Sequence, residues 1–292
     1  MGRRLFVILS VLLLSTASHA QGRKYSYKKK FGTQKNAAYF TWGYNRSAYT
    51  LSDINFYGPD YSFIVKDAKA HDRPARKINE YFDPRKFTTP QFNVRFGWYY
   101  KFRWDISIGY DHMKYVMDDY QSLLINGVIE DEFNPLYGTY TDEDGPRLIK
   151  RSELHYENTN GLNYVSLALN NTAPIYKTKN LKFAVLRRMG GGFGPVITQT
   201  DFTWDGVNHE SRFKVAGFGI SANAGLRFDF FNRFFFQSNW TAGWINLPKN
   251  NTIQSQQHFA KHNFFFAEWD LSMGLLFYFR TVNGCDTCPD WH

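Results

Sequence analysis

The final long stretch of the chain, residues 263–280, alternates apolar and polar residues with a period of two. Successive side chains of a β-strand point to opposite faces, so the alternation predicts a strand with one apolar and one polar face. The apolar face carries Ala267, Trp269, Leu271, Met273, Leu275, Phe277 and Phe279, and the polar face includes Glu268 and Asp270. A tilted strand of ~9–11 residues is long enough to cross a bilayer. The pattern therefore favours a strand that turns its apolar side to lipid and its carboxylates to a barrel lumen.

Seven more stretches predict strands, at about residues 37–49, 91–100, 104–116, 161–175, 181–197, 220–229 and 234–244. The connections alternate between long ones, near 50–89, 117–159, 198–212 and 247–262, and short ones, near 101–103, 176–180 and 230–233. Long extracellular loops and short periplasmic turns produce this alternation. We therefore expect an all-β fold, a closed antiparallel transmembrane β-barrel of about eight strands. A soluble β-sandwich is the alternative, but it would not usually place Trp and Phe at both ends of an aliphatic face.

The first twenty residues have the organisation of a secretory signal peptide. Arg3 and Arg4 precede the apolar run 5–14, and small residues at 18–20 suit cleavage before Gln21. The rest divides into a periplasmic lead-in at 21–36, the barrel at 37–280 and a periplasmic tail at 281–292. Export of a barrel predicts the bacterial outer membrane as its location.

Aromatic residues make up 19% of the chain, although the mean hydropathy is −0.47. In an outer-membrane barrel the lumen and loops supply the polarity, whereas the lipid-facing band and its girdles supply the rings. The formal net charge of +9 favours contact with anionic outer-membrane lipid and lipopolysaccharide. The chain has no Lys/Arg run that would indicate nucleic-acid binding.

The inward positions of the predicted strands carry several charges. Their ionisable members are Arg95, Asp105, Asp111, Arg227, Asp229, Glu268 and Asp270. The interior of an eight-stranded barrel is just wide enough for side chains to fill, and a buried charge without a partner costs several kcal/mol. We therefore predict a salt-bridged plug, with Arg95 and Arg227 facing the carboxylates of the strands at 104–116 and 263–280. A proton or ion path is the functional alternative.

His112 and Lys114 end the strand at 104–116 and continue the face of Tyr110. This placement predicts a basic pair at the headgroup level that contacts lipopolysaccharide phosphate.

His155 and Glu157, with nearby Asn residues, lie where the second long connection enters the strand at 161–175. The motif faintly resembles the His–Ser sites of outer-membrane lipid A deacylases and phospholipases, which need a serine nucleophile beside a histidine base. Glu157 stands where that pattern needs serine, and Ser152 has no shown relation to His155. We assign no catalytic residue and interpret the segment as a hydrogen-bonded junction.

The first long connection mixes basic and aromatic residues and is long enough to form a hairpin above the membrane, so it is the best candidate binding surface. The second is acidic, and residues 142–145 could hold Ca²⁺ but lack the EF-hand spacing, which favours a solvated loop. The run 190–192 lacks the Gly-Lys-Ser/Thr of a phosphate loop and predicts strand bending. We expect no metal and no cofactor.

Cys285 and Cys288, the two cysteines of the chain, lie in the tail. In an exported chain a single Cys-x-x-Cys favours a local disulfide over a zinc site. A soft metal held with Asp286 and His292, or a docking contact, is the alternative.

Four stretches, 42–46, 111–115, 160–164 and the last strand, resemble the small outer-membrane β-barrel proteins of Bacteroidota over about residues 37–280. The resemblance implies fold and location, and that family has no defined shared activity. We expect a non-enzymatic barrel that acts through its extracellular loops or as a subunit of a larger outer-membrane protein complex. A lipid A-modifying hydrolase (an outer-membrane esterase) and a small-solute pore are the alternatives.

Overall fold

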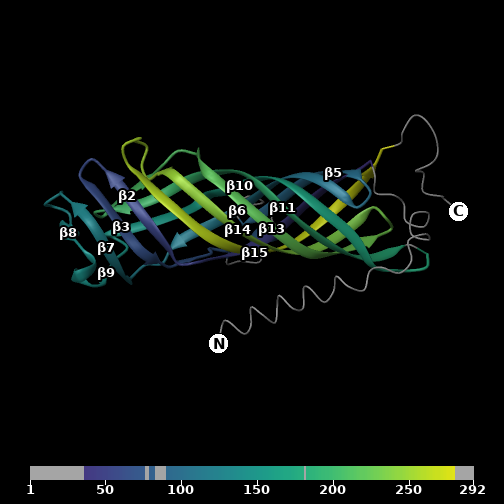
Figure 1. Ribbon diagram of the computed structural model, residues 1–292, viewed down its shortest axis with the longest axis horizontal. Helices are drawn as coiled ribbons and strands as arrows, with labels where there is room; N and C mark the ends of the chain where they lie inside the picture. The colour runs from purple at the N-terminus through teal and green to yellow at the C-terminus, as the bar shows by residue number, and fades with distance from the viewer. Residues whose placement is uncertain (1–35, 76–78, 83–89, 181, 280–292) are drawn as a thin grey trace. The chain divides into compact units, whose positions relative to one another are not determined.

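Among the described residues, eight antiparallel strands close into a ring in the order β1, β5, β6, β10, β11, β13, β14, β15, because β15 also pairs with β1 (Figure 1). The computed structural model describes residues 36–75, 79–82, 90–180 and 182–279. The predicted signal peptide, most of the lead-in and the cysteine-containing tail lie outside these residues. The ring strands are β1 (Ala37–Tyr49), β5 (Phe92–Lys101), β6 (Trp104–Met117), β10 (Leu154–Lys177), β11 (Phe183–Trp204), β13 (Lys214–Phe230), β14 (Phe234–Asn251) and β15 (Phe259–Tyr278).

The predicted sidedness of the last strand is confirmed. Leu271 and Met273 are 52% and 62% exposed on the outside of the ring, whereas Glu268 and Asp270 are 3% and 4% exposed on the inside. The prediction of a closed all-β barrel of about eight strands is confirmed with it. No helix among the described residues has the length and apolar character needed to span a membrane.

Several ring strands continue past the apolar band, and their polarity then inverts. In the first half of β6 the apolar residues Ile106 and Ile108 point outward and are exposed. Further along the same strand the inward positions become apolar, and Met113 and Tyr115 are buried there. Because the interior becomes apolar where the exterior becomes polar, one alternation rule does not describe a whole strand. β10 and β11 therefore extend well beyond the predicted 161–175 and 181–197.

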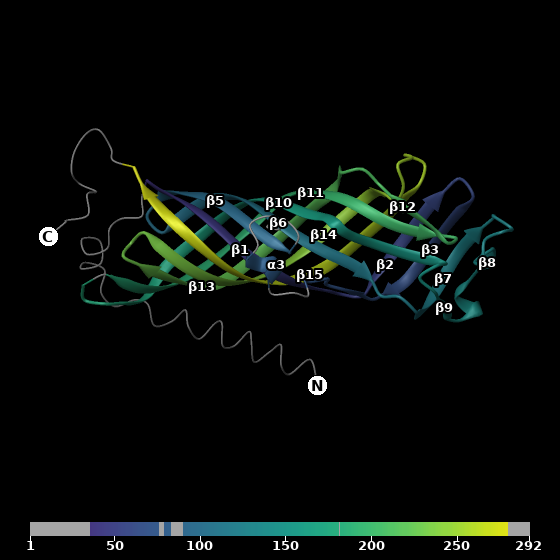
Figure 2. The same ribbon diagram turned by 180° about the vertical axis from the view of Figure 1, so that it is seen from behind.

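The two longest connections fold into one sheet at the loop end (Figure 2). The first contains the hairpin of β2 (Ser52–Gly58) and β3 (Tyr61–Ala68), and β2 also pairs with the start of β15. The second contains β7 (Gln121–Ile129), which pairs with β3. The sheet of the barrel wall thus continues through β2 and β3 to β7 and on to β8 (Gly138–Tyr140).

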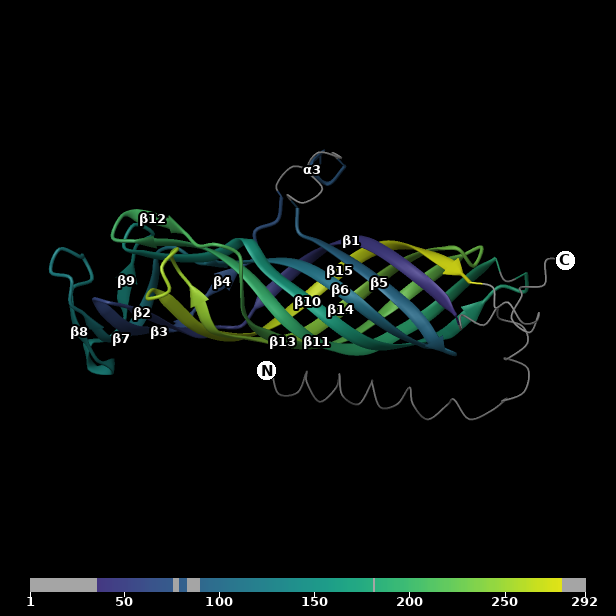
Figure 3. The same ribbon diagram turned by 90° about the horizontal axis from the view of Figure 1, so that it is seen from above.

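The smaller elements complete these connections. They are β4 (Ala70–His71), α3 (Asn79–Phe82), the 3₁₀ turn η1 (Asp142–Asp144), β9 (Arg147–Ile149) and β12 (Val207–Glu210). β4 pairs with the end of β6 and β9 pairs with β7, while β12 pairs with β11. The segment that carries α3 stands out from the barrel wall near β1 (Figure 3).

Candidate functional site

At the turn end the lumen contains an arginine that forms an ion pair with an aspartate of its own strand. Arg227, fully buried on β13, donates to both carboxylate oxygens of Asp229, at 2.6 and 3.2 Å, and to the hydroxyl of Tyr99 at 2.8 Å. Its guanidinium lies 3.6 Å from the ring centroid of Phe235. Arg227 therefore pairs within β13 rather than with the carboxylates of β6 or β15, which differs from the prediction.

The next layer of the lumen is built around an arginine that the sequence did not indicate. Arg188 donates to both oxygens of Asp105, at 2.7 and 2.9 Å, and to the hydroxyl of Tyr39 at 2.6 Å. The hydroxyl of Tyr39 donates in turn to Asp105 at 2.7 Å. Arg188 lies in the irregular part of the predicted strand, yet counting by two from the inward Ala184 and Leu186 reaches it.

A third layer holds most of the remaining predicted lumen charges. Arg95 and Asp111 form an ion pair at 3.2 Å. Glu268 accepts a hydrogen bond from the Asn45 amide at 2.9 Å, and Asp270 accepts one from the Asn239 amide at 3.2 Å. Across the three layers the described lumen charges comprise three arginines (Arg95, Arg188 and Arg227) and five carboxylates (Asp105, Asp111, Asp229, Glu268 and Asp270), so two acids lack an arginine of their own.

Beyond this layer the interior is apolar. A cluster of buried side chains from β2, β3, β6, β7, β10, β11 and β15 fills it, including Phe56, Phe63, Tyr115, Tyr156 and Phe264. Buried hydroxyls in it find partners, as when the Tyr156 hydroxyl accepts from the Asn250 amide at 2.5 Å. Ionic layers on one side and an apolar core on the other leave the described lumen packed with side chains, as in the interior of small eight-stranded barrels.

His112 and Lys114 lie on the outer face of β6 but are only 6% and 9% exposed. His112 forms a hydrogen bond with the Asn163 side chain at 2.7 Å and packs against the Phe92 ring at 5.5 Å. Asp72 and Arg73, from the connection after β4, lie close enough to Lys114 to act on its charge. The expected headgroup contact therefore does not match this structure, because neighbouring side chains cover both residues.

His155 is buried on the outer face of β10, between two carboxylates. Its Nε2 lies 3.0 Å from Glu157, and its Nδ1 lies 2.7 Å from Asp119. Arg73 pairs with Glu157 at 3.1 Å and Arg151 with Asp119 at 3.0 Å, so each of the two acids beside His155 also has an arginine partner. Both ring nitrogens thus lie within ion-pair distance of a carboxylate, which differs from the arrangement of a histidine base beside a serine nucleophile.

In residues 142–145, for which the sequence favours a solvated loop over a Ca²⁺ site, Asp142 and Asp144 accept hydrogen bonds from protein groups. Asp142 accepts two hydrogen bonds from the Lys66 ammonium, at 2.7 and 3.0 Å, and these, with one from Asn126, lower the pKa of its carboxyl. Asp144 accepts from the backbone and the hydroxyl of Thr141. Within the described ranges no group of three or more His, Cys, Asp or Glu side chains is arranged to hold a metal ion.

The glycine run belongs to the unbroken strand β11. A Cβ at Gly190 would lie 2.3 Å from the side-chain oxygen of Asn170, so glycine here makes room for a lumen amide.

The turn after β7 presents the most exposed large apolar side chain described. Phe133 is 93% exposed, although its turn is held by the backbone bonds Asn134 N to Asp131 O at 3.0 Å and Tyr137 N to Asn134 O at 2.9 Å. The Asn134 side chain also accepts from the backbone of Leu136 at 2.8 Å, and the Leu136 side chain is fully buried. Arg147 braces the turn through the carbonyl of Pro135 at 2.8 Å. Sequence reasoning placed this segment in a solvated acidic loop and missed the aromatic tip.

No protein-family model and no curated protein matches the chain. Solved structures with a similar arrangement include the outer membrane protein OprG from Pseudomonas aeruginosa, with 10% identity, a TM-score of 0.37, and 84% of this chain and 98% of that chain covered. For AlkL the identity is 9%, the TM-score 0.36 and the coverage 90% and 100%. For Ail, the attachment invasion locus protein of Yersinia pestis, the identity is 11%, the TM-score 0.33 and the coverage 83% and 99%. The chain resembles these proteins in the arrangement of its strands. The identities and TM-scores are too low to support an argument about its activity.

Proposed function

We propose that the protein is a non-enzymatic barrel of the bacterial outer membrane that binds another protein through its loop-end sheet. The apolar outer band of the ring supports the membrane location, and the alternation of long loops and short turns supports an extracellular position for the loop end. As a second form of this function, the barrel acts as a subunit of a larger outer-membrane protein complex.

The main support for the proposal is the exposed side chain of Phe133, which lies on a turn held by hydrogen bonds. The Phe133 side chain is 93% exposed, and aromatic residues are enriched among those that dominate the binding energy of protein interfaces. The hydrogen bonds of the turn and the buried Leu136 fix the backbone beforehand. Binding then loses little conformational entropy, which is the benefit of preorganisation.

The surroundings of Phe133 indicate the kind of partner. Glu130 and Glu132 are exposed beside it, and Tyr137, 51% exposed, follows on the same turn. An aromatic tip with an acidic rim is complementary to an apolar pocket that has a basic rim. We therefore expect the partner to be a protein with such a pocket on a surface that reaches the cell exterior.

Photo-crosslinking in native membranes tests the proposal. A benzophenone amino acid replaces Phe133 in the full chain, and the matched control carries it at Val207, which is 54% exposed on β12 at the same end. We expect a discrete protein adduct from position 133 that position 207 does not give. The absence of adducts from position 133, or the same adducts from both positions, would reject the proposed binding surface.

The arrangement gives less support to the other two functions. A hydrolase needs a histidine nitrogen free for a serine, and both nitrogens of His155 contact carboxylates. A pore needs a continuous wet path, and the described lumen is packed. Lipid A from a deletion strain should therefore keep its acylation pattern in mass spectrometry, and a changed pattern would favour the hydrolase.

A further inference from the structure

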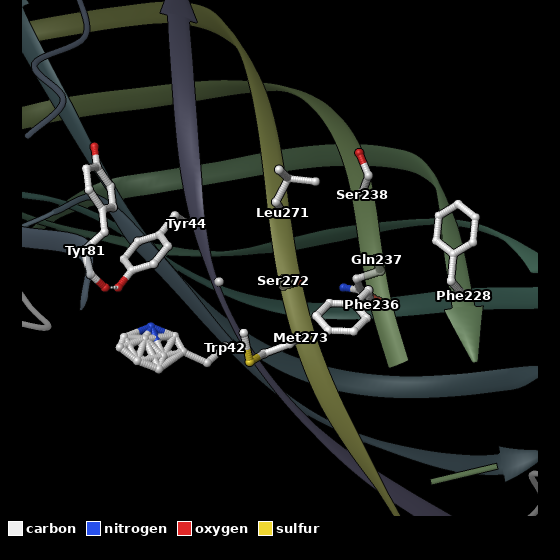
Figure 4. Close-up of a pocket in the computed structure, with 11 residues that line it drawn as sticks. Trp42, Tyr44, Tyr81, Phe228, Phe236, Gln237, Ser238, Leu271, Ser272 and Met273 are labelled. Carbon is white, nitrogen blue, oxygen red and sulfur yellow. Dashed lines mark hydrogen bonds between the residues drawn. The ribbon is translucent and has the colours of Figure 1, made fainter. Parts of the chain in front are cut away.

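An apolar groove of about 590 Å³ crosses the outer surface of the barrel (Figure 4). It runs from β1 over β15 to β14 and β13, and its lining includes Trp42, Tyr44, Leu271, Met273, Phe236 and Phe228. Its volume lies within the ~300–1,000 Å³ typical of ligand sites. A hollow of this size within the lipid-facing band can accommodate an apolar chain.

Tyr81 of α3 covers one end of the groove. Its ring meets that of Tyr44 edge-on at 4.9 Å, and its backbone carbonyl accepts a hydrogen bond from the Tyr44 hydroxyl. Its own hydroxyl donates to the carbonyl of Ala75 at 3.2 Å. These contacts with Tyr44 and Ala75 hold Tyr81 at the end of the groove.

Arg46 adds a positive charge at this covered end. It is the next outward residue of β1 after Tyr44, ~7 Å further toward the loop end at two residues of strand rise. The guanidinium lies over the Tyr81 ring at 5.3 Å, donates to the Tyr81 hydroxyl and donates to the carbonyl of Asn45 at 2.8 Å. A guanidinium has five N–H donors, and these two bonds use two of them. The carboxylate of Asp72 also lies near enough to interact with the Arg46 charge.

The groove is therefore amphipathic along its length, with a cation at the loop end and aromatic and aliphatic walls toward the turn end. A lipid has the same polarity when its headgroup lies at the membrane surface and its chains point inward. Arginine binds phosphate with several charge-assisted hydrogen bonds, which makes a phosphorylated headgroup the fitting anion.

We propose that the groove binds lipid A of the outer leaflet, with one acyl chain along Leu271, Met273 and Phe236 and a phosphate on Arg46. This inference rests on the proposed outer-membrane location, because the loop end must face the leaflet that contains lipid A. It does not depend on the proposed partner of Phe133, which lies in the turn after β7.

The test uses the full-length protein extracted in mild detergent, delipidated and titrated with purified bisphosphorylated lipid A in native mass spectrometry. Leu271→Trp fills the groove, and Leu169→Trp is the matched control, since Leu169 is an outward leucine of β10 with 44% exposure. We expect one lipid A per wild-type chain and about tenfold weaker retention by Leu271→Trp, equivalent to ~1.4 kcal/mol. Leu169→Trp should retain lipid A as the wild type does.

A second pair of variants tests the phosphate contact. Arg46→Gln should weaken binding of bisphosphorylated lipid A about fivefold, since one basic residue near a membrane surface contributes ~1 kcal/mol. It should leave binding of dephosphorylated lipid A unchanged. Arg187→Gln, at an exposed outward position of β11, is the control and should change neither. Heat-modifiable mobility in gels verifies that every variant is folded.

Several outcomes would overturn the inference. These are no lipid A on the wild type, equal retention by the two tryptophan variants, equal binding of phosphatidylglycerol, or a dimer that Leu271→Trp abolishes, which would make a second copy the occupant. Fractionation of the same cells separates this failure from failure of the proposed location. If the protein is found in the outer membrane but binds no lipid A, the lipid site is refuted and the proposed location is not.

Discussion

Arg188 of β11 and Asp105 of β6 meet over the intervening strand β10 through two hydrogen bonds of 2.7 and 2.9 Å. The exposed fractions of the two residues are 3% and 0%. Tyr39, from β1, donates to the same carboxylate and accepts from the same guanidinium. Three strands that are not neighbours in the sheet are thus tied together through the lumen, which fixes the barrel cross-section at this level.

Removing the charge of Asp105 should destabilise the barrel strongly. Asp105→Asn keeps the shape of the side chain but leaves the Arg188 guanidinium buried without a counter-charge, a change that typically costs about 3–5 kcal/mol. The expected result is a large downward shift of the urea midpoint, measured by tryptophan fluorescence in detergent micelles. A midpoint equal to that of the wild type would show that the ion pair is dispensable.

Glu268→Gln provides the contrast, because Glu268 has no arginine of its own among the described residues. Its carboxylate accepts from the Asn45 amide, and a glutamine oxygen can accept the same bond. Removing a buried charge that lacks a direct counter-charge should leave stability unchanged or raise it slightly. Equal destabilisation by Glu268→Gln and Asp105→Asn would contradict the layer assignment.

The packing of Tyr39 predicts a second effect, at Gly97. A Cβ on Gly97 would lie 2.3 Å from the Tyr39 ring, so the ring covers the glycine of the paired strand. Gly97→Ala should push the ring away from Asp105 and Arg188, and overpacking of this kind costs about 1–3 kcal/mol. The loss would be measured as a lower urea midpoint.

Gly191→Ala is the matched control for this substitution. On Gly191 the nearest atom to an added Cβ is a carbonyl oxygen at 2.9 Å, and no side chain lies within 4 Å. Its effect should be smaller than that of Gly97→Ala, because no lumen side chain has to move. An order of effects opposite to this one would remove Tyr39 from the explanation.

The sequence predicted the part of the fold that has an apolar exterior and a polar lumen. On β1 the predicted and observed bounds are the same, from Ala37 to Tyr49, because outward aromatic residues alternate with inward polar or small residues over positions 40–45. The alternation failed where β6 leaves the apolar band, since Met113 and Tyr115 enter an apolar core that no membrane dictates. That core is assembled from segments far apart in the chain, and periodicity within one segment carries no information about the others.

The ionic pairing was predictable only in outline. Inward positions follow from the period of two, so the lumen location of Asp105 and Arg227 could be read from the sequence. Partner choice depends on the barrel register, and a register shift between Pro174 and Tyr176 of β10 is invisible in the pattern. The cover over His112 was equally out of reach, because it comes from Phe92 and Asn163 on other strands.

Truncating a core side chain of the loop-end sheet should loosen that sheet without unfolding the barrel. Phe56 is fully buried, with the rings of Phe63, Tyr156 and Phe202 at 5.3, 5.7 and 5.5 Å. Phe56→Ala removes a side chain worth about 3–5 kcal/mol in a packed core. We expect rapid proteolysis within 50–75 while the gel mobility of the folded barrel is kept.

Phe133→Ala is the control for proteolysis, because the 93% exposed ring contributes little to packing. Its cleavage rate should equal that of the wild type, even though the variant should lose the proposed partner. Faster cleavage of Phe133→Ala would mean that the tip supports the sheet rather than a binding partner.

The filled lumen leads to a final expectation about conduction. Arg227, Arg188 and Arg95 form successive ionic layers, and the apolar core closes the loop end beyond them. The wild-type protein should therefore give no steady conductance steps in planar bilayers. Deleting residues 52–68, the β2–β3 hairpin, removes part of the apolar core but leaves all three layers in place, so this variant should remain closed as well. Steps in the deletion variant alone would place the barrier in the core, and steps in the wild type would show that ions pass the arginine layers despite their contacts.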